Sequence, residues 1–136
     1  MPTTKRERDY TENELVRKLM DACEAAMPGA VVTKHNDRTR SGWPDMSVAW
    51  NSHMSLWEVK HADPDFDLPG IQRLTCKRLA TQMTCCFVIY DSVTDVPATR
   101  IVEPRRMSEW RSAALLSIHG SYDHQWVAAF IKVTHS

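Results

Sequence analysis

Two short motifs contain the residues best suited to chemistry. The sequence GWPD ends at Asp45, and EVK begins at Glu58 after an interval of twelve residues. A two-residue turn at Asn51 and Ser52 would join the motifs in an antiparallel hairpin, with Asp45 directly opposite Glu58. Directly opposed residues have Cβ atoms about 4.5–5.5 Å apart, a separation that one divalent cation can bridge. Lys60 lies two residues beyond Glu58 and projects from the same face of the strand. The spacing therefore predicts two carboxylates and an ammonium group at one place.

Two further acidic residues lie at the start of the first expected helix. Thr11 and Glu14 form a capping-box pattern, and the apolar residues that follow repeat at helical spacing as far as Met27. At about 100° per residue, Glu12 falls in the middle of the apolar stripe and Glu14 points away from it. We therefore expect Glu12 to face the sheet and Glu14 to cap the helix. The alternative for Glu12 is a favourable interaction with the helix dipole alone.

Three carboxylates and one lysine on one side of a small sheet fit metal-assisted hydrolysis of a phosphodiester. Mg²⁺ prefers oxygen ligands and keeps several waters, so Asp45, Glu58, a main-chain carbonyl and waters form a suitable shell; Mn²⁺ is expected to substitute. Lys60 would orient the attacking water or stabilise the developing charge. The alternative is coincidence, because PD and ExK are short strings that occur by chance in about one or two chains of this length in a hundred.

Hydrophobic periodicity predicts the elements that position these residues. Strands are expected at 30–35, 46–50, 54–60 and 85–90, and helices at 11–27 and 68–83. A short edge strand at 99–102 and helices at 107–118 and 123–132 are expected to follow. The order α-β-β-β-α-β plus a helical C-terminal tail predicts an α/β fold with a mixed sheet flanked by helices. A right-handed parallel crossover should run from the third strand through the second helix to the fourth strand.

Composition limits the class of protein. The 136 residues suit one domain, and 43% hydrophobic with 25% charged residues is typical of a folded chain. Seventeen basic residues balance seventeen acidic ones, so a nucleic acid must be bound by local clusters. The N-terminal segment has no apolar signal region and no apolar run is long enough to span a membrane, which predicts a cytoplasmic protein without a membrane partner. The four cysteines have no metal-site spacing and are expected to be reduced and buried.

Basic residues gather on both sides of the expected site, and they are candidate contacts for phosphates. The first cluster precedes the PD motif and the second belongs to the second helix, in a stretch without acidic residues. They are Lys34, His35, Arg38 and Arg40, and then Arg73, Lys77 and Arg78. The alternative for each cluster is an ordinary solvated face.

These motifs resemble the PD-(D/E)xK nuclease superfamily. The early Glu12, GWPD, LWEVK and the LPGIQ run are most similar to the stand-alone virus-type replication-repair nuclease (VRR-NUC) domain, and ENELV also resembles archaeal Holliday-junction resolvases. The resemblance covers about residues 11–91 and implies a restriction-endonuclease-like fold. It implies that Glu12, Asp45, Glu58 and the Val59 carbonyl surround the metal, that Lys60 is the catalytic lysine, and that Gln72 supports the site. Stand-alone members are similar to junction-resolving enzymes, which act as homodimers on branched DNA.

The leading hypothesis is therefore a Mg²⁺-dependent, structure-selective DNA endonuclease, a homodimeric Holliday-junction resolvase of a bacterial cell or a phage-infected host. A chain of this length has little room for the additional domains of flap-cutting relatives, which favours junctions. The dimer interface is expected within residues 110–131. One alternative is a restriction-like, sequence-specific nuclease. The other is a catalytically inactive DNA-binding or inhibitory protein on the same fold.

Overall fold

The computed structural model describes residues 10–35, 43–62, 70–92 and 96–136, with the main chain alone for 70–72. Its elements, in chain order, are α1 (Glu12–Ala26), β1 (Val31–Lys34), β2 (Met46–Trp50), β3 (His53–Ala62), α2 (Gly70–Ala80), β4 (Thr84–Asp91), β5 (Ala98–Val102), the 3₁₀ helix η2 (Pro104–Glu109), β6 (Leu116–His119) and α3 (His124–Thr134). The chain is an α/β protein in which a mixed sheet is flanked by helices.

The six strands form one sheet in sequence order, β1-β2-β3-β4-β5-β6. β3 and β4 pair in parallel, and the other four pairs of neighbours are antiparallel. The parallel pair confirms the predicted crossover connection through α2. β4 is buried along nearly its whole length, as its continuous apolar run predicts for a strand that is covered on both faces.

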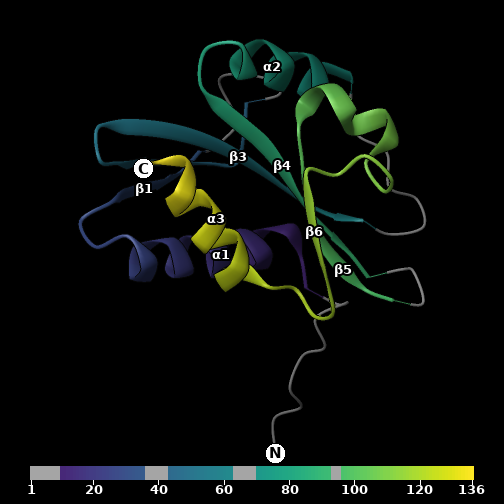
Figure 1. Cartoon of the computed structure of the whole chain (residues 1–136), viewed down its shortest axis with the longest axis horizontal. Helices are drawn as coiled ribbons and strands as arrows, with labels where there is room; N and C mark the ends of the chain where they lie inside the picture. The colour runs from purple at the N-terminus through teal and green to yellow at the C-terminus, as the bar shows by residue number, and fades with distance from the viewer. Residues whose placement is uncertain (1–9, 36–42, 63–69, 93–95) are drawn as a thin grey trace, which may run out of the picture.

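Helices cover both faces of the sheet. α1 and α3 pack against each other on one face, and α2 and η2 lie together on the other (Figure 1). The apolar side chains divide accordingly: Trp57 and Val59 belong to the core under α1 and α3, while Leu56 and Ala62 belong to the core under α2. Because side chains alternate along a strand, the even-numbered positions of β3 project towards α2.

The β2–β3 hairpin turns as its sequence predicts. Asn51 and Ser52 have φ values of 53° and 63°, the left-handed conformations that a two-residue type I′ turn requires at both positions. Trp50 consequently pairs with His53, and the ladder continues outward to Met46, which pairs with Trp57. The register predicted from the turn is therefore confirmed. It brings the residue before β2, Asp45, to the level of Glu58.

α1 begins as its capping pattern predicts. The Thr11 hydroxyl accepts a hydrogen bond from the Glu14 main-chain N–H at 3.2 Å, and its own proton is donated to the Glu14 carboxylate at 3.3 Å. The apolar stripe of α1 supplies Leu15 and Leu19 to the core. This cap fixes where the helix starts, and hence where Glu12 stands.

The C-terminal third differs from the prediction of a helical tail. The helix expected at 107–118 is wrong: η2 starts earlier, at Pro104, and Leu116–His119 forms β6 instead. β6 pairs with β5, so the strand expected at the sheet edge is an internal strand. Local spacing of apolar residues favoured a helix, but pairing along an available strand edge prevails over that weak preference. The expected helix at 123–132 is confirmed as α3.

Two general expectations can be compared with the structure. All four cysteines are free and buried, as expected. Among the described residues there is no helix with the length and apolar character needed to cross a membrane.

Candidate active site

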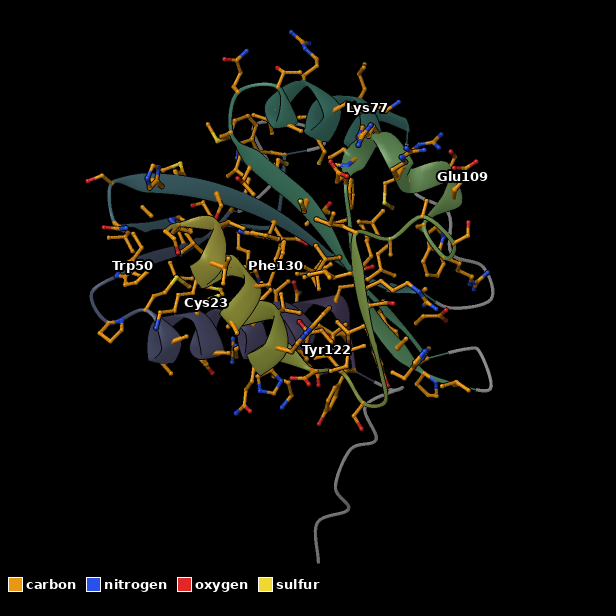
Figure 2. The ribbon with its side chains drawn as sticks, viewed as in Figure 1. Cys23, Trp50, Lys77, Glu109, Tyr122 and Phe130 are labelled. Carbon is orange, nitrogen blue, oxygen red and sulfur yellow. The ribbon has the colours of Figure 1, made fainter. Side chains whose placement is uncertain are left out.

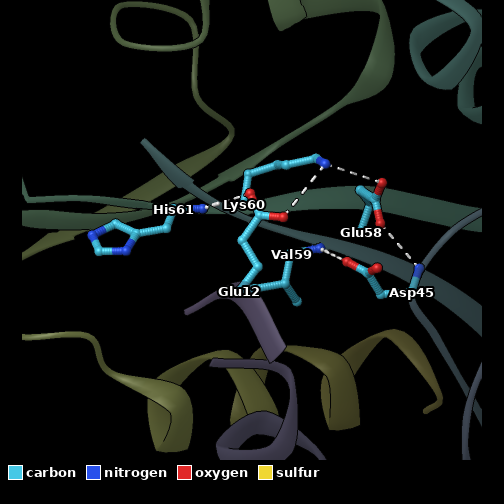
Figure 3. Close-up of polar contacts among 6 residues, drawn as sticks. All are labelled: Glu12, Asp45, Glu58, Val59, Lys60 and His61. Atoms are coloured by element: carbon cyan, nitrogen blue, oxygen red, sulfur yellow. Dashed lines mark hydrogen bonds and ion pairs between the residues drawn. The ribbon is translucent and has the colours of Figure 1, made fainter. Parts of the chain in front are cut away.

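Asp45 and Glu58 lie together where β2 begins. The Asp45 main-chain N–H donates a hydrogen bond to Glu58 Oε1 at 3.1 Å, and Asp45 Oδ2 accepts one from the Val59 N–H at 2.9 Å (Figure 3). The hairpin register sets this arrangement, because Asp45 immediately precedes Met46, whose partner Trp57 immediately precedes Glu58 in the opposite direction of the ladder. The two carboxyl groups predicted to face each other are therefore adjacent.

Glu58 is completely buried. Burial, then the hydrogen bond and the negative charge of Asp45, raise the pKa of Glu58 to about 10. The ammonium group of Lys60 acts in the opposite direction, but its effect is smaller. In the absence of a cation the Glu58 carboxyl group therefore keeps its proton at neutral pH. A bound divalent cation would reverse this preference by stabilising the carboxylate.

Lys60 links this carboxyl pair to the first helix. Its Nζ lies 3.7 Å from Glu58 Oε2 and 3.7 Å from Glu12 Oε2. The Lys60 side chain is 13% exposed, whereas Glu12 is 46% exposed. Glu12 thus contacts Lys60, and its expected place around a metal stays a prediction. Figure 3 shows the ammonium group between the two glutamates. Glu12 is exposed and Glu14 half-buried, so burial does not follow the expectation that Glu12 faces inward and Glu14 outward.

β2 starts at Met46, so the part of β3 after Trp57 has no β2 residue beside it. Side chains bind its main-chain N–H groups there instead. Asp45 accepts the Val59 N–H, and Glu12 Oε1 accepts the His61 N–H at 3.5 Å. In an antiparallel ladder the N–H and C=O of one residue point towards the same neighbour. The Val59 carbonyl oxygen therefore lies at the same edge as Asp45, where the resemblance to nucleases expects a metal ligand.

His61 is a site residue that sequence reasoning missed. Its Nδ1 is 2.8 Å from the Tyr10 carbonyl oxygen, its Nε2 is 2.7 Å from the Ser92 hydroxyl, and its ring stacks on Tyr90 at 5.2 Å. Because the carbonyl can only accept, Nδ1 must carry a proton; the neutral imidazole then accepts the Ser92 hydroxyl proton at Nε2. His61 thereby ties the start of α1, and with it Glu12, to the end of β3. Its position directly after the EVK motif was the available signal.

The first cluster of candidate DNA contacts is only partly described. Lys34 donates a hydrogen bond to Asn13 of α1 at 3.2 Å. The His35 N–H donates to the Asp45 carbonyl oxygen at 2.7 Å, so His35 supports the strand end that carries Asp45. Arg38 and Arg40 lie outside the described residues. The structure thus gives Lys34 and His35 local contacts next to the site.

The second cluster lies on α2. Arg73, Lys77 and Arg78 are all exposed. Gln72 lies in the first turn of the same helix, but its side chain is outside the described part of the structure. Its predicted supporting role therefore stays a prediction.

Two thiols pack where α2 meets the sheet. Cys76 forms a hydrogen bond with Cys85 of β4, and this bond together with burial raises the pKa of Cys76. Cys76 also lies close enough to Glu58 and Asp45 to interact with them electrostatically. Cys76 is buried and packs with Cys85 in the core under α2.

The donor set for a metal is small. Among the described residues, no three His, Cys, Asp or Glu side chains lie close enough together to hold a metal ion on their own. Asp45 and Glu58 would need the Val59 carbonyl oxygen and waters to complete a shell. That composition fits Mg²⁺, which binds through one or two carboxylates and keeps several waters.

No protein-family model matches the chain, and no curated protein matches it. The fold and site define an α/β protein in which a buried glutamate, a half-buried aspartate and a lysine lie together at the β2–β3 edge. Any closer assignment has to be argued from these residues.

Proposed function

We propose that the protein is a metal-dependent DNA endonuclease of the PD-(D/E)xK superfamily, built on a restriction-endonuclease-like fold. The observation that carries this proposal is the contact of Asp45 and Glu58 with Lys60 close by, on the same strand as Glu58. Burying the Glu58 carboxyl group next to that of Asp45 costs free energy, and a cation bound between them would compensate for that cost. A purely structural role would be better served by apolar residues at these positions.

The oxygens of this site suit Mg²⁺, with Mn²⁺ as a substitute. Asp45, Glu58 and the Val59 carbonyl oxygen would hold the ion. With the ion bound, the site gains Lewis-acid polarisation of the phosphodiester and a water of lowered pKa. Lys60, at 3.7 Å from Glu58, is placed to donate a hydrogen bond to the attacking water or to a phosphoryl oxygen that gains charge.

Glu12 and His61 would act on Lys60 from outside the metal shell. The contact with Glu12 limits the rotation of the Lys60 ammonium group. His61 fixes the main chain from which α1 starts, and so holds Glu12 in reach. A lysine that is positioned before the substrate arrives loses little conformational freedom in the reaction.

The substrate we propose is branched DNA, most specifically a four-way junction, cut by a homodimer. The supporting observations are the basic residues of α2 next to the site and the resemblance of the motifs to stand-alone nucleases. Resolution of a junction needs two symmetric cuts, which a two-fold dimer with one site in each protomer can make.

The decisive test uses Lys60→Ala, with Lys132→Ala as a control that removes the same charge from the exposed surface of α3. Both variants and the wild type are incubated with labelled junction, flap, linear duplex and single strand, with Mg²⁺ or with EDTA. We expect Mg²⁺-dependent cutting of the junction that falls at least about a hundredfold in Lys60→Ala and is unchanged in Lys132→Ala.

Circular dichroism checks that both variants are folded. Equal cutting by folded Lys60→Ala and wild type would refute the assignment of the lysine. DNA binding without cutting of any of the four substrates would favour an inactive DNA-binding protein, and cutting of linear duplex at defined base sequences would favour a restriction-like enzyme.

A further inference from the structure

A hollow of about 270 Å³ lies between α2 and η2, outside the carboxyl site. Three cationic side chains line it: Arg73 and Lys77 from α2 and Arg105 from η2. Ser108 and the apolar residue Leu74 also line it. We call this hollow the α2–η2 groove. In Figure 2, Lys77 and Glu109 mark the two elements that border it.

The charge of the groove is unbalanced. Arg73 and Lys77 stand four residues apart on one face of α2, an arrangement of like charges that destabilises a helix. Residues 70–80 include no acidic residue. Among the described residues, no carboxylate forms an ion pair with Arg73 or Lys77, and the partner of Arg105 is Glu103, at 3.4 Å in an exposed pair. Exposed pairs contribute little, so Arg105 stays available to an anion.

The apolar part of the groove is also unusual. Leu74 is 54% exposed although it stands between two cations of the same helix. An apolar side chain beside cationic side chains matches a sugar–phosphate unit, in which a sugar ring adjoins each anionic phosphate. A free inorganic anion would use the charges but would leave Leu74 uncovered.

The groove lies on the same face of the sheet as the carboxyl pair. α2 separates the two, since Cys76 on its buried side interacts with Glu58 while Lys77 lines the groove. A helix with its side chains is about 10–12 Å wide. Nucleotides of one strand rise by about 3.4 Å each, so a strand that crosses α2 would span it in about three to four nucleotides.

We propose that the α2–η2 groove binds a backbone phosphate of nucleic acid, about three to four nucleotides from the bond held at the carboxyl pair. Arg73, Lys77 and Arg105 donate to the phosphate oxygens, with Ser108 as a neutral donor, and Leu74 contacts the sugar. This inference rests on the proposed function for the position of the bond to be cut. The phosphate contact itself is independent of catalysis.

The test measures DNA binding without cutting, in EDTA, by fluorescence anisotropy of labelled duplex and junction over a range of salt concentrations. The variants are Arg73→Ala, Lys77→Ala and Arg105→Ala. The control is Arg17→Ala, which removes one charge from the exposed surface of α1 on the opposite face of the sheet. We expect each groove variant to weaken binding several-fold and to lower the slope of log K against log salt by about one. Arg17→Ala should match the wild type.

The outcomes separate the two proposals. If the wild type cuts DNA but the groove variants keep its affinity and salt slope, the groove assignment is overturned and the nuclease stands. If the groove variants lower the salt slope but the wild type never cuts, the nuclease is overturned and the groove stands as a phosphate site. If the wild type binds no DNA, both are overturned, and binding of inorganic phosphate by the wild type would then assign the groove to small anions.

Discussion

Glu58 should make the stability of the metal-free protein depend on pH. Its pKa is raised from 4.5 to about 10, so the folded state holds the proton more tightly than the unfolded state. The contribution of this group to the free energy of unfolding is complete below about pH 4.5 and is lost progressively as the pH rises towards 10. Burial of the side chain is the main cause.

Glu58→Gln should remove this dependence, because glutamine resembles the protonated carboxyl group and cannot ionise. In EDTA, we expect it to raise the free energy of unfolding at pH 9 by at least about 1 kcal/mol, about 3 °C in Tm, with little change at pH 5. Thermal melts at pH 5, 7 and 9 measure this, with exposed Glu24→Gln as the control. Parallel pH profiles for Glu58→Gln and wild type would contradict it.

The same proton should oppose metal binding. Mg²⁺ requires the carboxylate, so binding must release the Glu58 proton, and the affinity should rise by up to about tenfold per pH unit between pH 6 and 9. Isothermal titration calorimetry in buffers of different ionisation enthalpy counts the protons released, and we expect close to one per ion at pH 7. Binding that releases no proton would show that Glu58 does not hold the ion. Glu24→Gln should titrate as the wild type does.

At this scale much of the site was predictable. The turn residues Asn51 and Ser52 set the register, and the register alone brings Asp45 to Glu58. The role of His61 was not predictable, because its partners Tyr10 and Ser92 lie far from it in sequence and meet it only through the fold.

At the scale of the elements, variants of α1 can distinguish the roles of its two neighbouring acidic residues, Glu12 and Glu14. Glu12→Gln should lower cleavage by at least about tenfold at little cost in stability, since its carboxylate contacts Lys60 and is half exposed. Glu14→Ala should instead lower the free energy of unfolding by about 0.5–2 kcal/mol, because Glu14 belongs to the cap with Thr11. Thermal melts and single-turnover cleavage distinguish the two. A stable but inactive Glu14→Ala beside a fully active Glu12→Gln would reverse the assignment.

The elements that the sequence did not predict lie in the C-terminal third. The segment 116–119 is mostly exposed, and its apolar–polar alternation covers only four residues, too few to mark it as a strand within a longer helix-like pattern. It becomes one because β5 presents an open edge with the register Ile101 to Leu116. Segments with a strong apolar pattern were predicted well: α1 from the helical spacing of its apolar residues and β4 from its continuous apolar run.

For the whole molecule, the prediction is a homodimer. Sedimentation velocity at micromolar concentration should give a dimer, with and without a four-way junction. Val127, Ala128 and Ile131 lie in the expected interface region 110–131, but they are buried in the chain's own core and are not available to a partner. A monomer that cuts junctions as efficiently as it cuts other branched DNA would contradict the prediction.

The contacts of α3 also have a consequence for how the chain folds. Tyr122 donates a hydrogen bond to the Leu15 carbonyl oxygen across 107 residues of sequence, and His135 joins Ser55 across 80. Closing such long loops costs conformational entropy before any contact compensates for it, so folds of this kind form slowly. Until α3 docks, the apolar face of α1 and the sheet beneath it stay open to other chains. We therefore expect the rate at which α3 docks to decide how much of the chain folds and how much aggregates.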